Sequence, residues 1–370
     1  MSGWNAIRGL ICAVVLVLGA TRIPAQTLET RAGAVRVETV LSGLDVPWAL
    51  DFLPDGGFLV TQRGGVLLYV RDGRARRVAG TPAVWARGQG GLLDVTVARD
   101  FAATGEVFLT FARRQGGGAS TALAVARLDT GAARLRDLRV IFQAQPGSGG
   151  GRHFGSRVIE APDGKLFLTL GERGDAASAQ DRSSHNGSIL RLARDGSAPA
   201  DNPFAGQQGM RPEIWSYGHR NPQGAALDAT GRLWAVEHGA RGGDEINRIR
   251  RGANFGWPVI AYGRHYSGAK IGEGTAKPGM EQPEFYWDPS IAPSGMMIYS
   301  GKLWPRWRGH FFVGSLKFDH ISRLSGRPLQ EAERIAGPQT GRVRDVIEAP
   351  DGSIWFVSQT RGAVFRMTPG

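Results

Sequence analysis

A two-strand hydrophobic pattern recurs along the chain. Each copy has an apolar run, a turn rich in aspartate and glycine, and a second apolar run. The six copies fall at 48–60, 92–111, 158–170, 224–236, 295–314 and 343–357. Copies three and six share six consecutive residues, Ile159–Gly164 and Ile347–Gly352. Asp-Gly between apolar runs is a strong hairpin signal, because both residues accept the backbone angles of a tight turn. The pattern therefore predicts a series of similar antiparallel hairpins.

A further short apolar run follows most copies, as at 65–70, 188–192 and 363–367. Six units with three or four strands each predict an all-β chain folded as a six-bladed β-propeller. The 54 glycines suit tight turns better than helices. A β-sandwich remains a minor alternative, since it would need fewer and less similar hairpins. No linker divides the sequence, so we expect residues 26–370 to form a single domain.

The N-terminal segment has a different pattern. An uncharged, mostly apolar run, Leu10–Ala20, follows one positive charge at Arg8 and is too short to span a bilayer. It predicts a signal peptide over residues 1–25, cleaved after Ala25, and hence a periplasmic or secreted protein. The one cysteine, Cys12, lies within it. No later apolar run approaches the roughly 20 residues of a membrane helix, so we expect no integral membrane segment and a monomer or weak dimer.

The formal net charge of the chain is +12. Arginines are scattered over expected turns and strand ends, and no Lys/Arg-rich block or stacked-aromatic signature is present. Nucleic acid is therefore not an expected partner. A small acidic ligand remains compatible with this charge.

The stretch 218–254 combines two features that point to a binding site. Arg220 and Asn221 stand in its first loop, where a guanidinium can grip a planar, oxygen-rich anion. A glycine-rich acidic turn at 239–247 offers many carbonyl oxygens, which are ligands for a hard cation such as Ca²⁺. Either half alone is more simply a turn between strands, whereas both within one stretch favour a site.

Other candidates lie at similar positions in other repeats. His153 stands among glycines before the third copy and is a candidate general base, although a loop histidine is more often structural. Gln89 precedes the second copy and offers a donor and an acceptor. Arg342 and Arg344 share one face of the expected sixth-copy strand, so their charges imply an anionic partner. Ser315–Lys317 follows the fifth copy.

Taken together, these motifs resemble the soluble PQQ-dependent sugar dehydrogenases, most closely their periplasmic aldose sugar dehydrogenase branch. The resemblance covers nearly the whole chain after residue 40. Its most specific pieces are Gly218–Gly224, Gly242–Asn247, Asn254–Pro258 and Glu281–Pro283. That family has a six-bladed propeller, as the repeats predict independently.

The resemblance implies oxidation of an aldose at its anomeric carbon, with PQQ and Ca²⁺ as cofactors. His153 would be the base, and Arg220 would polarise the quinone. The cofactor-binding set would be Gln89, Arg220, Asn221, Tyr266, Ser315, Leu316, Lys317, Arg342, Val343 and Arg344. Calcium would be bound by the carbonyls of Gly239 and Ala240, and a second calcium by Glu245 with the carbonyl of Phe255. The electron acceptor stays unknown.

The sequence also departs from the glucose-specific members of that family. Arg152 replaces an acidic residue, Ala240 replaces a proline, and the long loops are absent. An open, broadly tolerant pocket is therefore expected. Two rival functions remain: a calcium-dependent lactonase-type hydrolase, which would need carboxylates in the channel, and a non-catalytic binding propeller.

Overall fold

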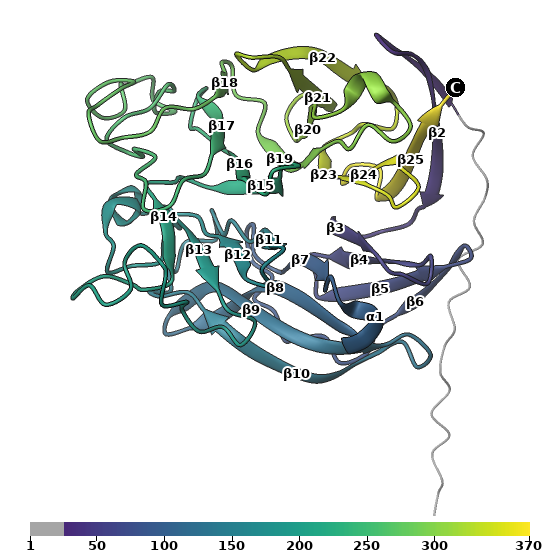
Figure 1. Cartoon of the computed structure of the whole chain (residues 1–370), viewed down its shortest axis with the longest axis horizontal. Helices are drawn as coiled ribbons and strands as arrows, with labels where there is room; N and C mark the ends of the chain where they lie inside the picture. Colours follow the sequence, from purple (N-terminus) through teal and green to yellow (C-terminus); the bar gives the residue numbers. More distant parts are fainter. Residues whose placement is uncertain (1–25) are drawn as a thin grey trace, which may run out of the picture.

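A computed structural model describes residues 26–370, and the predicted signal peptide lies outside the described residues. The chain forms six antiparallel sheets, five with four strands and one with five. Figure 1 shows them arranged around a centre, with one strand of each sheet innermost. The predicted six-bladed β-propeller is thus confirmed. Within residues 26–370, no helix is long and apolar enough to cross a membrane.

The first three blades follow the chain in order. Blade 1 contains β3 (Pro47–Phe52), β4 (Phe58–Gln62), β5 (Val66–Arg71) and β6 (Arg74–Arg77). Blade 2 contains β7 (Leu92–Val97), β8 (Glu106–Gln115), β9 (Gly118–Asp129) and β10 (Arg134–Gln143), with the short helix α1 (Phe101–Thr104) between β7 and β8. Blade 3 contains β11 (Val158–Glu160), β12 (Leu166–Thr169), β13 (Ser188–Leu192) and β14 (Ile214–Tyr217), with the 3-10 helix η1 (Ala176–Gln180).

The last three blades complete the ring. Blade 4 contains β15 (Pro222–Leu227), β16 (Leu233–Glu237), β17 (Asp244–Arg248) and β18 (Phe285–Trp287). Blade 5 contains β19 (Pro293–Ile298), β20 (Phe311–Ser315), β21 (His320–Ser325) and β22 (Gln330–Ala336), with η2 (Pro305–Trp307). Blade 6 contains β23 (Val343–Glu348), β24 (Ile354–Ser358) and β25 (Ala363–Pro369). Each predicted hydrophobic copy supplies the two innermost strands of one blade.

Blade 6 is closed by the opposite end of the chain. β2 (Gly33–Leu41) pairs with β25, and β1 (Gln26–Thr30) pairs with β2 (Figure 1). The hydrophobic repeat did not predict these two strands, because they lie outside the six copies. Pairing the first and last strands in one sheet joins the ends of the ring.

The repeated turns have a common physical cause. In several copies the aspartate side chain accepts the backbone N–H two residues further on, as Asp163 does from Lys165 at 3.0 Å and Asp228 from Thr230 at 2.9 Å. This side chain replaces part of the turn's own backbone bonding. The glycine in the turn after Asp163, Gly164, has φ of 76°, which a side chain would disfavour.

The hydrophobic core lies between the blades rather than in one central mass. Six buried clusters each join two neighbouring blades. Leu59 and Leu109 belong to the cluster between blades 1 and 2, and Phe312 and Phe356 to the one between blades 5 and 6. The innermost strands surround the middle of the ring, where polar side chains such as Asp94, Arg157 and Asp345 line a channel.

Candidate functional site

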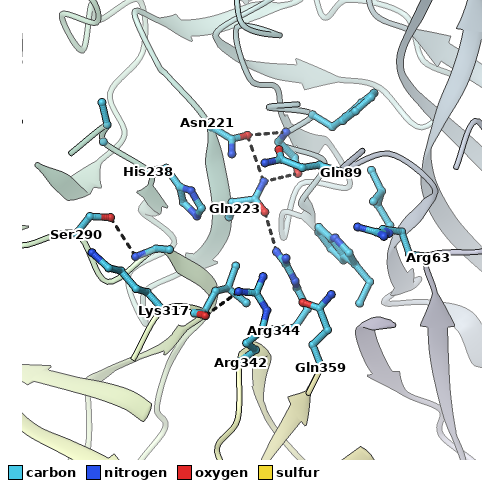
Figure 2. A pocket seen from close by; sticks show the side chains of 18 of the residues that line it. Arg63, Gln89, Asn221, Gln223, His238, Ser290, Lys317, Arg342, Arg344 and Gln359 are labelled. Atoms are coloured by element: carbon cyan, nitrogen blue, oxygen red, sulfur yellow. Dashed lines mark hydrogen bonds between the residues drawn. The ribbon is translucent and has the colours of Figure 1, made fainter. Parts of the chain in front are cut away.

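A cavity of about 730 Å³ lies at one end of the channel (Figure 2). Loops and strand starts from all parts of the ring contribute to its wall. Among the residues that line it are Trp48, Arg63, Gln89, Asn221, Gln223, His238, Arg241, Tyr266, Leu316, Lys317, Arg342 and Arg344. The cavity therefore collects residues from all six predicted repeats or the loops beside them.

The wall of this cavity is strongly cationic. Arg63, Arg241, Lys317, Arg342 and Arg344 line it, and among the described lining residues there is no aspartate or glutamate. The pKa of Arg344 is lowered to about 9, first by burial and then by nearby cations, Arg342 among them. Such a wall favours a ligand with several negative charges, which would offset this repulsion.

A hydrogen-bond network connects the two sides of the cavity. Arg344 Nη1 donates to Gln223 Oε1 at 3.0 Å, and Gln223 Nε2 donates to Asn221 Oδ1 at 3.2 Å (Figure 2). Asn221 Oδ1 also accepts the N–H of Gly155 at 3.1 Å. Asn221 Nδ2 and Arg344 Nε are buried without a hydrogen-bond partner among the described residues. These unpaired donors are suited to an acceptor-rich ligand.

His153 is held by two contacts beside the cavity. Its Nδ1 lies 2.7 Å from Glu172 Oε2, and its backbone N–H donates to Gln89 Oε1 at 2.7 Å. Burial lowers the pKa of His153, and Arg220 lowers it further, against the opposing effect of Glu172. The imidazole is therefore neutral at neutral pH. Glu172 holds Nδ1 as the protonated nitrogen, so Nε2 is the basic atom.

The loop that carries His153 is fixed by a buried arginine. Arg173 Nη2 donates to the carbonyl of Gly150 at 2.8 Å, and Nη1 donates to the carbonyl of Arg152. Its guanidinium carbon also lies 3.3 Å from the centroid of the Phe154 ring. His153 itself has φ of 57°, in the left-handed region. These contacts stabilise the left-handed backbone conformation of His153, which without them would cost about 1–3 kcal/mol of folding free energy.

A second, much smaller cavity of about 20 Å³ lies next to Arg220. Gly239, Ala240, Glu245 and Phe255, the predicted calcium ligands, all line it. Burial and, next in size, the charge of the nearby Glu237 together raise the pKa of Glu245 to about 8. In residues 26–370 no group of three or more His, Cys, Asp or Glu side chains is arranged around a metal position. Any cation here would therefore depend mainly on carbonyl oxygens.

Arg220 is anchored at the wall of the smaller cavity. Its backbone N–H donates to Glu237 Oε2 at 2.7 Å, and its guanidinium lies 5.2 Å from the centroid of the Trp257 ring. The same carboxylate forms a hydrogen bond through Oε1 with His219 Nδ1 at 2.8 Å. Arg220 Nε is buried and unpaired among the described residues. The side chain thus keeps a free donor at the smaller cavity.

The structure brings most of the predicted site residues together. Gln89, Asn221, Tyr266, Leu316, Lys317, Arg342 and Arg344 line the large cavity, together with Gly239 and Ala240. Tyr266 is 75% exposed and stands at its mouth. His153 and Arg220 do not line it, although Phe154, Gly155 and Asn221 beside them do.

Two predicted residues have side chains engaged elsewhere. Ser315 Oγ donates to the carbonyl of Ile291 at 2.8 Å, and Val343 packs in the core between blades 5 and 6. The expected strand alternation of Arg342 and Arg344 is wrong. β23 begins at Val343, Arg342 precedes it with φ of 41°, and the pairing shifts register between Val343 and Asp345. Both arginines nevertheless reach the cavity.

Sequence reasoning missed four important residues. Glu172 follows its strand in a loop, and Gln223 and Arg63 lie at strand ends, so nothing in the local sequence marks them. His238 lines the large cavity, and its Nε2 lies 2.6 Å from the carbonyl of Pro293. Burial lowers the pKa of His238 to about 3, with nearby Arg220 contributing. A signal for His238 existed in the sequence, since it stands beside the predicted calcium turn.

These features define a six-bladed propeller with a cation-lined cavity at one end of its channel and a buried histidine–carboxylate pair beside it. Residues 44–366 match the family model described as glucose/sorbosone dehydrogenase. The chain belongs to the glucose/sorbosone dehydrogenase family, and the resemblance seen in its motifs is confirmed.

Individual relatives agree with this assignment. Aldose sugar dehydrogenase YliI of Escherichia coli is 42% identical over 345 residues, covering 90% of this chain and 93% of the relative. The solved apo-form structure of the soluble aldose sugar dehydrogenase of Escherichia coli has a TM-score of 0.87 at 41% identity, covering 91% of this chain and 100% of that one. The PQQ-bound aldose sugar dehydrogenase of Streptomyces coelicolor has a TM-score of 0.76 at 28% identity, covering 90% and 98%.

Proposed function

We propose that this protein is a PQQ- and calcium-dependent dehydrogenase that oxidises aldose sugars at the anomeric carbon to lactones. The observation that carries the proposal is the cation-lined cavity, free of carboxylates in its described wall, beside the His153–Glu172 pair. A PQQ-bound relative supports the choice of cofactor. The electron acceptor stays unknown, and export to the periplasm or beyond stays a prediction.

The large cavity fits PQQ in charge and in donors. PQQ carries three carboxylates and two quinone oxygens, so it accepts hydrogen bonds around most of its edge. Lys317, Arg342 and Arg344 would hold its carboxylates, and Asn221 Nδ2 offers an unused donor. Gln89 Oε1 already accepts the N–H of His153, so Gln89 would donate to the cofactor through its Nε2. When bound, PQQ supplies the acceptor for the hydride that leaves the sugar.

Calcium fits the small cavity in a similar way. Glu245 is half-buried. Burial and the nearby Glu237 both disfavour its ionisation and raise its pKa, so a divalent cation would offset the charge of both carboxylates. The carbonyls of Gly239, Ala240 and Phe255 are the hard oxygen ligands that Ca²⁺ prefers. Together with the calcium ion, Arg220 would stabilise the negative charge that develops on a quinone oxygen of the cofactor.

The protein's part in the chemistry is to take a proton. His153 is neutral, and Glu172 holds its Nδ1, so Nε2 can accept the proton of the anomeric hydroxyl. The C1–H electrons leave as hydride while the C1–O bond becomes a carbonyl. The resulting imidazolium is stabilised by the Glu172 carboxylate. Tyr266 at the mouth leaves the sugar side open, in keeping with a broadly tolerant pocket.

The test is reconstitution of metal-stripped protein with PQQ and Ca²⁺, assayed with aldoses and a dye acceptor. We expect dye reduction that needs both additions and falls about 10²- to 10⁴-fold in His153→Ala, because the base is lost. His238→Ala is the matched control, since the cavity holds this second neutral histidine. A loss confined to His238→Ala would move the base to His238, and no PQQ binding would overturn the proposal.

The lactonase alternative requires carboxylates that converge on the substrate. The described wall of the large cavity has none, so this alternative is weaker than oxidation. Lactone hydrolysis by the same protein without PQQ would reverse that ranking. A non-catalytic binding propeller would show no dye reduction with any aldose in the reconstitution.

A further inference from the structure

Gln223 lies where three blades meet at the floor of the cavity. It belongs to β15 and is only 8% exposed. Figure 2 shows its side chain between those of Asn221 and Arg344. Its side chain bonds Arg344 from blade 6, Asn221 from its own blade, and the carbonyl of Gly155 beside blade 3. A single amide therefore fixes two cofactor-binding candidates and the segment that follows His153.

The acceptor that Gln223 offers to Arg344 is uncharged. No described carboxylate forms an ion pair with Arg344, and its Nε has no partner. Arg157, deeper in the same channel, is bound differently: Nη1 lies 2.6 Å from Asp94 Oδ1 and Nη2 lies 3.1 Å from Asp345 Oδ1. Arg157 is thus neutralised within the protein, whereas Arg344 is oriented with its charge left available.

We propose that Gln223 is a positioning residue that aims Arg344 and Asn221 at a carboxylate-bearing cofactor without neutralising Arg344. The proposal rests on PQQ as the cofactor. An amide can do this because its oxygen accepts from the guanidinium while its nitrogen donates to Asn221 Oδ1. That second bond turns Asn221 so that its own Nδ2 stays free for the ligand.

A purely structural role would make a different prediction. Gln223 would then contribute only to the stability of the fold, and its removal would leave PQQ affinity unchanged. The two roles separate when affinity and stability are measured on the same variants. The coupling between Gln223 and Arg344 is measured with a double-mutant cycle.

The experiment titrates PQQ, in the presence of Ca²⁺, into wild-type protein and into Gln223→Met, Arg344→Met and the double variant. We expect Gln223→Met to raise the Kd about tenfold or more, because Arg344 loses its orientation. The double variant should bind within about threefold of Arg344→Met alone. Additive losses would overturn the proposal, and so would a Gln223→Met variant that is less stable but binds PQQ normally.

Two further variants sharpen the result. Gln223→Glu keeps an acceptor for Arg344 but brings a charge, so we expect weaker PQQ binding than in wild type. Equal or tighter binding would refute the need for an uncharged acceptor. Gln143→Met is the matched control, because Gln143 Oε1 accepts from Arg113 Nη1 at 2.7 Å away from the cavity. Its PQQ affinity should equal that of wild type.

The same cycle on the apo protein separates this inference from the proposed function. If wild-type protein binds no PQQ, the proposed function fails. The denaturation midpoints of the four apo proteins still report the hydrogen bond between Gln223 and Arg344. We expect the double variant to be no less stable than Arg344→Met. Independent shifts of the midpoint would show that the two side chains are not coupled.

Discussion

The two ends of the propeller channel carry opposite charge, although the same six inner strands build both. The cavity at one end has a cationic wall without carboxylates among its described lining residues. The pocket toward the other end is lined by Asp51, Asp94 and Asp345, together with the cations Arg99 and Arg157. Most of the cationic set stands in loops or just outside the strands, whereas the three aspartates lie within β3, β7 and β23.

The difference lies in how the charges are satisfied. At the acidic end, Arg157 pairs with two aspartates, and Asp94 Oδ2 accepts the N–H of Val158 at 2.8 Å. At the cationic end, buried donors of Arg344 and Asn221 have no described partner. Removing one partner of a buried ion pair leaves an uncompensated charge inside the fold and is therefore destabilising. A buried donor that has no partner in the protein remains available to a ligand. Substitutions at the two ends should therefore have different consequences.

The largest effect is expected at the acidic end. Arg157→Met would leave Asp94 and Asp345 buried without their cation, which costs about 3–5 kcal/mol of unfolding free energy. Chemical denaturation of the apo protein measures this loss. Arg36→Met, which removes an exposed ion pair with Glu38, is the control and should cost no more than about 1 kcal/mol. Similar losses in both variants would contradict the assigned difference.

At the cationic end we expect a substitution to reduce ligand affinity while leaving the stability of the protein nearly unchanged. Lys317→Gln should leave the stability of the apo protein within about 0.5 kcal/mol, because the side chain is exposed and has no described ion pair. PQQ affinity should fall by about tenfold, the equivalent of about 1.4 kcal/mol for one charge-assisted contact. Calorimetric titration checks the affinity. Unchanged affinity would place Lys317 outside the cofactor's reach.

A further prediction concerns the pH dependence of stability at the acidic end. Burial raises the pKa of Asp51 from 3.8 to about 7. The folded protein therefore holds a proton that the unfolded chain releases, and this contribution to stability is complete below pH 3.8 and is lost as the pH rises through 7. The stability advantage of wild type over Asp51→Asn should shrink across that window.

Comparing the two proteins removes the contribution of groups whose titration is independent of Asp51. His238, whose pKa is lowered to about 3, contributes with the opposite sign, since its stability is present at neutral pH and is lost on acidification. Denaturation of both proteins at several pH values between 4 and 8 gives the difference. A constant difference would mean that Asp51 stays ionised in the folded state.

Much of the site could be predicted because its residues sit in motifs with a clear chemical meaning. Arg220, Asn221 and the glycine-rich turn that follows them belong to one stretch of sequence, and the structure places them around adjoining cavities. Glu172 and Gln223 could not be predicted in the same way. Their roles depend on partners, His153 and Arg344, that only the folded ring brings within hydrogen-bond distance.

The sequence alone determined the number of blades and the hairpin at the heart of each. Both follow from local physics: alternating apolar runs form strands, and Asp-Gly turns favour a reversal between them. The tertiary structure decided how β2 closes blade 6 and how one set of inner strands forms a cationic end and an acidic end. These features depend on contacts between residues far apart in the chain, such as Arg157 with Asp345, which no local pattern specifies.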